Sequence, residues 1–323
     1  MTNGYTAPVL RWYAGNARDL PWRRPGTSAW SVLVSEIMLQ QTPVARVLPA
    51  HAAWLERWPD PPALAAATPG DAVRQWGRLG YPRRALWLHA CSVILTEKHG
   101  GQVPASVAEL RGLPGVGGYT AAAVASFAFG QRHAVLDTNV RRVLARLVRG
   151  EHQPPRSASA AETRLAEALL PALPGRAARW SVAIMELGAL VCTAARPDCA
   201  SCPVARQCAW HRAGSPAGPG RPAKPRYPGS DRECRGRLLA VLREAAGPVA
   251  HSRLGAAWPH PEQRDRALRA LVADGLAAAL ADGTYTLPGT YALPGASPAP
   301  GSSPAGLAAA ADVGPSGRNH DHL

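Results

Sequence analysis

The sequence has 323 residues, in which 36 lysines and arginines outnumber 22 aspartates and glutamates and give a net charge of +14. This excess favours a polyanionic partner, most simply nucleic acid, although the preponderance of arginine, alanine, glycine and proline is also typical of a GC-rich genome. No apolar run approaches 18 residues, and no basic region precedes an apolar run at the N-terminus. A membrane span and a secretory signal are therefore not expected, and we predict a soluble, cytoplasmic protein.

Apolar residues recur at helical spacing through the first two thirds of the chain, and no strand pattern appears before residue 248. Glycine and proline interrupt the pattern at short loops. Helices are expected at residues 8–16, 30–41, 46–58, 70–76, 83–99, 107–111, 120–129, 139–148, 160–170 and 176–191. This part of the chain is therefore predicted to be all-α.

The last third is predicted to form a separate small domain. Residues 212–231 are basic, rich in proline and glycine and without periodicity, as in a linker. Helices are expected at residues 234–245, 251–258 and 262–271, followed by strands at 276–280 and 285–287 around an Asp-Gly turn. Three helices and a hairpin resemble a winged helix. Many winged-helix domains bind DNA, and some only mediate contacts between proteins. Residues 289–323 are predicted to be disordered.

A glycine-rich stretch, residues 113–121 (LPGVGGYTA), lies between two of the expected helices. Pro114 with Gly115, Gly117 and Gly118 excludes a regular helix and permits a tight turn. A turn that ends at a helix N-terminus presents unpaired backbone N–H groups, which suit a phosphate, and glycines let a nucleic-acid backbone approach closely. The alternative is an ordinary loop between two helices.

Two carboxyl groups stand out because their surroundings differ. Glu36 lies on the apolar stripe of an expected helix, and burial there would raise its pKa toward that of a general acid. The alternative is a glutamate that caps a loop or pairs with an arginine. Asp137 precedes an expected helix, where it can be an N-cap whose backbone bonds keep it ionised. The pair is therefore expected in opposite protonation states, as an acid and a charge stabiliser are.

Four of the six cysteines cluster with the spacing Cys192-x6-Cys199-x2-Cys202-x5-Cys208. In a chain without an expected secretory signal, this clustering favours a metal site over disulfides. Four thiolates suit either a [4Fe-4S] cluster or tetrahedral zinc. A single Cys-x-x-Cys pair favours the iron–sulfur cluster, because zinc ribbons usually have two such pairs.

Four motifs together resemble the helix-hairpin-helix DNA glycosylase superfamily and, within it, the MutY-type adenine DNA glycosylases. They are residues 35–42 (SEIMLQQT), 113–121, 135–142 (VLDTNVRR) and the cysteine spacing, and they span roughly residues 9–208. The resemblance implies a mainly α, two-lobed fold with a [4Fe-4S] loop. Residues 29–136 would form a six-helix barrel lobe with the hairpin, residues 1–28 and 137–211 the iron–sulfur lobe, and residues 232–288 the winged-helix-like domain.

The resemblance also implies the roles of individual residues. Glu36 would protonate the adenine leaving group, Asp137 and Tyr119 would stabilise the sugar cation, and Asn139 would orient Glu36 or a water. Tyr119 stands where endonuclease III-type relatives carry a lysine that attacks the sugar and permits strand cleavage. A phenol forms no Schiff base, so the reaction is expected to stop at the abasic site.

Other residues match family positions that contact the base or the duplex. Arg18, Trp22 and Arg23 would line the adenine pocket, although Trp22 could equally be a core residue. Gln41, Leu79 and Tyr81 are candidates to fill the space that an extruded base leaves, although Leu79 and Tyr81 also suit ordinary packing. The expected DNA contacts are completed by Thr42, Gly115, Gly117 and Gly118.

Two departures from the family pattern bear on specificity. Val182 aligns with a position where many members carry a glutamine or glutamate against adenine, and the usual Nudix-like C-terminal domain that reads 8-oxoguanine is not visible. We expect a monomeric, monofunctional glycosylase of base excision repair that acts at the nucleoid on double-stranded DNA. Its expected substrate is adenine opposite 8-oxoguanine or guanine. The alternatives are a G:T mismatch thymine glycosylase on the same scaffold and an iron–sulfur DNA-binding regulator.

Overall fold

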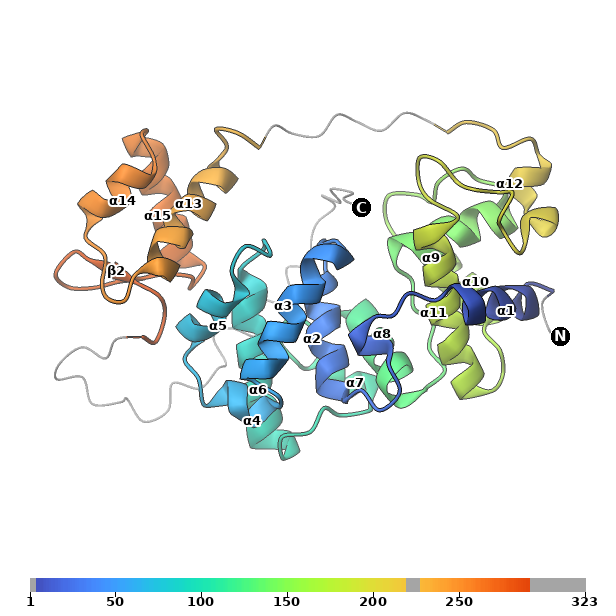
Figure 1. Ribbon diagram of the computed structural model, residues 1–323, viewed down its shortest axis with the longest axis horizontal. Helices are drawn as coiled ribbons and strands as arrows, with labels where there is room; N and C mark the ends of the chain where they lie inside the picture. The colour runs from blue at the N-terminus through green and yellow to red at the C-terminus, as the bar shows by residue number, and fades with distance from the viewer. Residues whose placement is uncertain (1–3, 219–226, 291–323) are drawn as a thin grey trace.

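The computed structural model describes residues 4–218 and 227–290, and the mainly helical fold expected from the sequence is confirmed (Figure 1). Of the disordered tail predicted at 289–323, residues 291–323 lie outside the described residues, as do residues 219–226 of the predicted linker. Within the described part of the tail, Oγ1 of Thr290 donates to the Leu287 carbonyl oxygen at 2.7 Å. Within the described ranges, no helix is long and apolar enough to cross a membrane.

The helices form three groups along the chain. The first group is α2 (Ala29–Leu39), α3 (Val44–Arg57), α4 (Pro61–Ala65), α5 (Pro69–Trp76), α6 (Arg83–His99), α7 (Val107–Arg111) and α8 (Gly118–Phe129). The second joins α1 (Thr6–Asn16) to α9 (Thr138–Leu144), the π-helical turn η2 (Ala145–Arg149), α10 (Ala160–Leu169), α11 (Pro174–Leu190), the 3-10 turn η3 (Ala205–Gln207) and α12 (Ala209–Arg212). A 3-10 turn, η1 (Pro21–Arg23), connects the two groups.

The third group is the C-terminal domain, with α13 (Asp231–Glu244), α14 (His251–Ala257), α15 (Pro261–Ala273) and the antiparallel strands β1 (Ala278–Ala279) and β2 (Tyr285–Thr286). The three helices and hairpin that the sequence predicted are present, but the strands are shorter. Val249 compensates by exchanging two backbone hydrogen bonds with Tyr285, at 2.8 and 2.9 Å, on the other side of β2. The hairpin is thereby tied to the segment that leads into α14.

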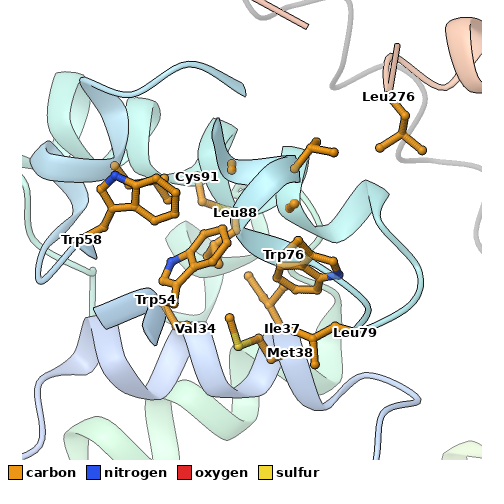
Figure 2. Packing of buried hydrophobic residues seen from close by; sticks show 14 of the residues in the cluster. Val34, Ile37, Met38, Trp54, Trp58, Trp76, Leu79, Leu88, Cys91 and Leu276 are labelled. Atoms are coloured by element: carbon orange, nitrogen blue, oxygen red, sulfur yellow. The ribbon is translucent and has the colours of Figure 1, made fainter. Parts of the chain in front are cut away.

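The core of the first group surrounds α2, the helix that carries Glu36 (Figure 2). This helix is apolar on nearly every side, and its residues from Trp30 to Met38 are buried. Trp54 of α3 lies edge-to-face with Trp58 at 4.7 Å and with Trp76 at 5.7 Å between ring centroids. Aromatic pairs in this geometry add to the stabilisation from area burial. Nε1 of Trp30 in α2 donates to the Trp58 carbonyl oxygen at 3.2 Å and connects α2 to this group.

A second core lies between α1, α9, α10 and α11. At Gly188 of α11, an added Cβ would lie 2.8 Å from the backbone oxygen of Asn139 at the start of α9. Glycine therefore lets the two helices approach closely at this point. The contact fixes the position of α9 and of Asp137, which caps it.

The C-terminal domain docks on the first group beside α5, and its apolar residues join the same core (Figure 1). Arg74 of α5 donates to the carbonyl oxygens of Arg243 and Ala245, and Arg243 donates back to that of Val73. Arg83 of α6 and Arg235 of α13 both pair with Asp274. The domain thus adjoins the N-terminal end of α6 through both apolar and charged contacts.

Gly70 makes this docking testable. Its N–H donates to the carbonyl oxygen of Pro288 at 2.7 Å, and an added Cβ would lie 2.6 Å from that oxygen and from Cγ2 of Thr290. We expect Gly70→Ala to destabilise the docked domain by about 1–3 kcal/mol, the usual cost of overpacking. Limited proteolysis and thermal unfolding would measure it. The matched control is Gly15→Ala in α1, where a Cβ meets open space; equal effects of the two variants would contradict the prediction.

Candidate active site

Three segments bring Glu36, Tyr119 and Asp137 together. Glu36 is 5% exposed in α2, Tyr119 is the second residue of α8, and Asp137 precedes α9. Burial is the main cause that raises the pKa of Glu36 to about 7, and the Asp137 charge raises it further. A hydrogen bond with Tyr119 and the charge of Arg23 oppose this rise. Glu36 therefore holds a proton near neutral pH, as a general acid requires.

Asp137 caps α9 as the sequence suggested. Its Oδ1 accepts a 2.6 Å hydrogen bond from the Val140 N–H, and its Oδ2 accepts a 2.8 Å bond from the Asn139 amide. Arg142 donates in turn to Oδ1 of Asn139 at 2.7 Å and to the Gly188 carbonyl oxygen. Both oxygens of Asp137 are therefore fixed in place by groups that are themselves bonded.

The side chain of Asn139 bonds Asp137 and Arg142, and its role in orienting Glu36 or a water stays a prediction. The pKa of Asp137 is raised rather than lowered, because burial outweighs the bonds from Val140 and Asn139 and the charge of Arg142. The bonds from Val140 and Asn139 and the charge of Arg142 favour the anion of Asp137, and that anion in turn raises the pKa of Glu36.

Glu186 in α11, which the sequence analysis does not identify, contacts two of the residues predicted to line the pocket. Its side chain is fully buried, and it accepts two 2.7 Å bonds from Arg18 and one from Arg23. Burial would raise its pKa, but these bonds and the arginine charges lower it to about 2. The only available signal was a carboxyl group on an apolar helix, the same signal that marked Glu36. Its partners lie more than 160 residues away in the chain.

The three pocket candidates from the N-terminal segment lie in different surroundings. Arg18 and Arg23 meet at Glu186, and Arg23 also acts electrostatically on Glu36 and Tyr119. Trp22 is 6% exposed and packs edge-to-face on His51, in agreement with the alternative of a core role. Val182 lies on α11 one turn before Glu186.

The glycine-rich stretch forms the predicted turn between α7 and α8. Gly115 has a φ of +74°, and a Cβ there would lie 2.8 Å from the Trp87 ring, so both conformation and space require glycine. Gly117 and Gly118 are exposed at the N-terminus of α8, with no heavy atom within 4 Å of an added Cβ. The turn thus presents an open backbone surface at a helix N-terminus, which suits an anion.

The candidate wedge residues divide into exposed and buried ones. Gln41 and Tyr81 are exposed, the latter by 43%, and both have a left-handed backbone, with φ of +56° and +47°. Leu79 is 5% exposed and packs in the core shown in Figure 2. Thr42 is 7% exposed, and its hydroxyl accepts a 2.9 Å bond from Arg84. Only the first two are therefore available to a ligand without rearrangement.

The four clustered cysteines line one cavity near η2 and α12. Burial and the charges of the other three thiolates together raise the pKa of Cys202 to about 11, and Nη1 of Arg146 lies 3.4 Å from Sγ of Cys192. In the described part of the chain, no three Cys, His, Asp or Glu side chains could share one metal ion. Four thiolates around one cavity are the donor set that a [4Fe-4S] cluster takes.

Comparisons with known proteins agree with this arrangement. Residues 34–169 match the model of the family described as HhH-GPD superfamily base excision DNA repair protein. A curated protein named adenine DNA glycosylase from Mycolicibacterium smegmatis is 51% identical over 280 residues, which cover 86% of this chain and 94% of that protein. The human protein of the same name is 42% identical over 215 residues, which cover 63% of this chain and 39% of the human one.

Solved structures show the same fold. A thermostable thymine-DNA glycosylase aligns with a TM-score of 0.58 at 25% identity, covering 65% of this chain and 95% of its own. Endonuclease III in a non-covalent DNA complex aligns with a TM-score of 0.55 at 23% identity, covering 65% and 94%. From the sequence relationship, the chain belongs to the adenine DNA glycosylases of the HhH-GPD superfamily, enzymes of base excision repair that act on adenine in DNA.

Proposed function

We propose that this glycosylase hydrolyses the N-glycosidic bond of adenine with Glu36 as general acid and Asp137 as the stabilising anion. The observation that carries the proposal is the burial of Glu36 near Asp137, whose two oxygens accept hydrogen bonds from Val140 and Asn139. This burial raises the pKa of Glu36 to about 7. Glu36 donates its proton to the departing adenine, and the anion of Asp137 stabilises the cationic sugar that remains. Water then adds to the sugar carbon and loses a proton, leaving an abasic site.

We also propose that the reaction ends there. Tyr119 sits beside both carboxyl groups, and burial with their charges raises its pKa well above the ordinary value, so it remains a neutral phenol. A Schiff base with the sugar needs an amine. The sequence has two lysines; Lys98 is exposed in the last turn of α6, and Lys224 lies outside the described residues. Strand cleavage is therefore expected only when alkali breaks the abasic site.

Glu186 with Arg18 and Arg23 supplies the polar wall of the proposed adenine pocket. We expect Glu186→Gln to slow excision about 10- to 100-fold, the cost of losing charged hydrogen bonds. Arg23 lowers the pKa of Glu36, and without Glu186 its charge is less neutralised. The alkaline limb of the pH–rate profile should therefore move to lower pH. Glu162→Gln, which breaks the buried pair with Arg141, is the control. If the alkaline limb of the pH–rate profile moved equally in both variants, the role of Glu186 in the pocket would be contradicted.

The turn at Gly117 and Gly118 and the exposed Gln41 and Tyr81 form the proposed contacts with duplex DNA. The open N-terminus of α8 suits a backbone phosphate, and the two side chains suit the space that an extruded adenine vacates. We propose that Cys192, Cys199, Cys202 and Cys208 hold a [4Fe-4S] cluster. When bound, that cluster would tie the segment after α11, at Cys192, to the start of α12, at Cys208, and shape a surface that carries Arg196 and Arg206. The protein is proposed to work as a monomer at the nucleoid.

We propose that the substrate is adenine opposite 8-oxoguanine or guanine. Single-turnover base release from duplexes with A:8-oxoguanine, A:G, T:G and A:T pairs, read before and after alkali, tests this. We expect adenine release from the first two and strand breaks only after alkali. Thymine release from T:G would favour the activity named for the structurally similar thymine-DNA glycosylase. Breaks without alkali would refute the hydrolytic end point.

A further inference from the structure

Arg84, the second residue of α6, caps the helix that carries the general acid. The arginine is 2% exposed, and its Nη1 donates to the carbonyl oxygens of Ile37, Met38 and Gln40 at 3.0, 2.7 and 2.6 Å. α2 ends one residue before Gln40, so these are carbonyls that the helix leaves without a partner. A cation at this end also complements the helix dipole.

The same guanidinium holds the loop that precedes α6. Its Nη2 donates to the Gly80 carbonyl oxygen and to Oγ1 of Thr42, each at 2.9 Å. Its Cζ lies 5.4 Å from the ring centroid of Tyr81 and 5.1 Å from that of Trp76. One planar side chain therefore bonds two loops, residues 40–42 and residues 77–82, that lie almost forty residues apart in the sequence.

Both loops contain a non-glycine residue in the left-handed region, Gln41 and Tyr81. That conformation is unfavourable for an L-residue and persists where surrounding contacts hold it. Arg84 bonds the carbonyl oxygen of the residue directly before each of them, Gln40 and Gly80. The guanidinium thus fixes the peptide group that leads into each strained residue.

The glycine-rich turn is connected to the same point. Nε2 of Gln40 lies 3.2 Å from the Gly115 carbonyl oxygen and 3.3 Å from Oγ1 of Thr120, and donates to both. The carbonyl oxygen of Gln40 accepts from Arg84 at the same time. The side chains of Arg84 and Gln40 therefore link three segments that are separate in the sequence: residues 40–42, residues 77–82 and the glycine-rich turn.

We propose that Arg84 is a positioning residue for base extrusion, which presets Gln41 and Tyr81 to enter the duplex when adenine leaves it. This proposal rests on the proposed role of those two residues. Arg84 touches neither the carboxyl pair nor the adenine pocket, so it acts through the loops. Burial lowers its pKa to about 10, and it therefore remains charged at neutral pH.

Arg84→Met and Arg84→Lys are the test variants. Methionine keeps the apolar stem and removes every donor, and the single ammonium of lysine cannot reproduce the fork that spans both loops. Arg243→Met is the matched control, because Arg243 is also a mostly buried arginine that donates to a carbonyl oxygen, with a pKa of about 10. If activity fell only because a buried arginine side chain was removed, Arg84→Met and Arg243→Met would lose the same activity.

Single-turnover excision is compared on two duplexes, one with adenine in an A:G mispair and one with adenine opposite an abasic site. The second adenine has no pairing partner and costs less to extrude. We expect Arg84→Met to slow release from the mispair about 30-fold or more but to slow release opposite the abasic site less than about threefold. Arg84→Lys should show the same selectivity with a smaller loss, and Arg243→Met should show none.

Hydrogen exchange of the free protein gives a readout independent of activity. Arg84→Met should speed exchange in residues 40–42 and 77–82 but not in α11, while Arg243→Met should leave both loops unchanged. Equal losses on the two duplexes, or unchanged exchange in the loops, would overturn the proposal. Wild-type protein that released adenine from neither duplex would instead refute the proposed function, and exchange would still decide whether Arg84 holds the loops.

Discussion

Glu36→Gln is expected to lower the single-turnover rate of adenine release by about 10³-fold or more, toward the upper end of what one general acid contributes. Glutamine has the shape of the protonated glutamic acid and can still bond Tyr119, but it has no proton to give to the departing base. Because the native side chain is already largely neutral below pH 7, the exchange introduces no buried charge. Thermal stability should therefore change little.

Binding separates this chemical role from a structural one. Fluorescence anisotropy with a duplex that carries an abasic-site analogue should give the Glu36→Gln variant nearly the wild-type affinity. Glu97→Gln, an exposed glutamate of α6, controls for the loss of one acidic residue and should leave the rate unchanged. A Glu36→Gln variant that releases adenine within tenfold of the wild-type rate would show that another group supplies the proton.

The pH dependence follows from the same carboxyl group. Its pKa is raised to about 7, and the protonated form is the active one. The rate constant, measured with the protein below saturation, should fall at low pH, where Asp137 with its raised pKa takes up a proton. Above the pKa of Glu36 it should fall about tenfold for each pH unit, which gives the alkaline limb of the profile. Glu36→Gln should abolish this limb along with the activity. A profile that rises between pH 7 and pH 9 would mean that the ionised form is active and that Glu36 is a base.

Features whose cause is local could be predicted from the sequence. The burial of Glu36 follows from the apolar residues of its own helix, and the cap by Asp137 follows from its place before α9. The turn at Gly115 follows from glycine and proline in a row. Helices α6 and α7 begin and end where expected because glycine or proline flanks them. In each case the deciding interaction spans only a few residues.

Features that depend on distant partners could not be predicted. Glu186 is recognisable as a site residue only once two arginines more than 160 residues away meet it. The pKa of Asp137 is raised because burial of its carboxyl group in the fold outweighs the N-cap hydrogen bond, and the sequence shows only the cap. Leu79 and Tyr81 are two residues apart in the loop of residues 77–82, and the fold buries Leu79 and exposes Tyr81. Such outcomes are set by tertiary packing, about which a single sequence says little.

The C-terminal domain has a different charge balance from the rest of the chain. Residues 227–290 carry eight arginines and seven acidic residues, whereas most of the net charge of +14 lies before them. The Mycolicibacterium relative shares this domain, because a match over 86% of the chain must extend beyond its start. This domain has a nearly neutral composition and contacts the rest of the chain through α5 and Asp274.

Asp137→Asn is expected to slow adenine release about 10²- to 10³-fold, the range measured when one preorganised electrostatic contact to a transition state is removed. The cation formed on the sugar would lose its anionic neighbour. Asparagine is as good an N-cap as aspartate, so its side-chain oxygen can still accept from the Val140 N–H and α9 should stay folded. The new amide group would, however, face the Asn139 amide, which Arg142 holds in its present orientation.

Asn139→Ala separates the charge from that hydrogen bond. It removes the same bond to Asp137 but keeps the anion, and one such bond amounts to about tenfold in rate. We therefore expect Asn139→Ala to slow adenine release about tenfold and Asp137→Asn to slow it at least ten times more. Equal losses would mean that Asp137 acts by holding a fixed hydrogen-bonded geometry. A clear excess for Asp137→Asn would show that its negative charge, opposite the proton of Glu36, is what the reaction requires.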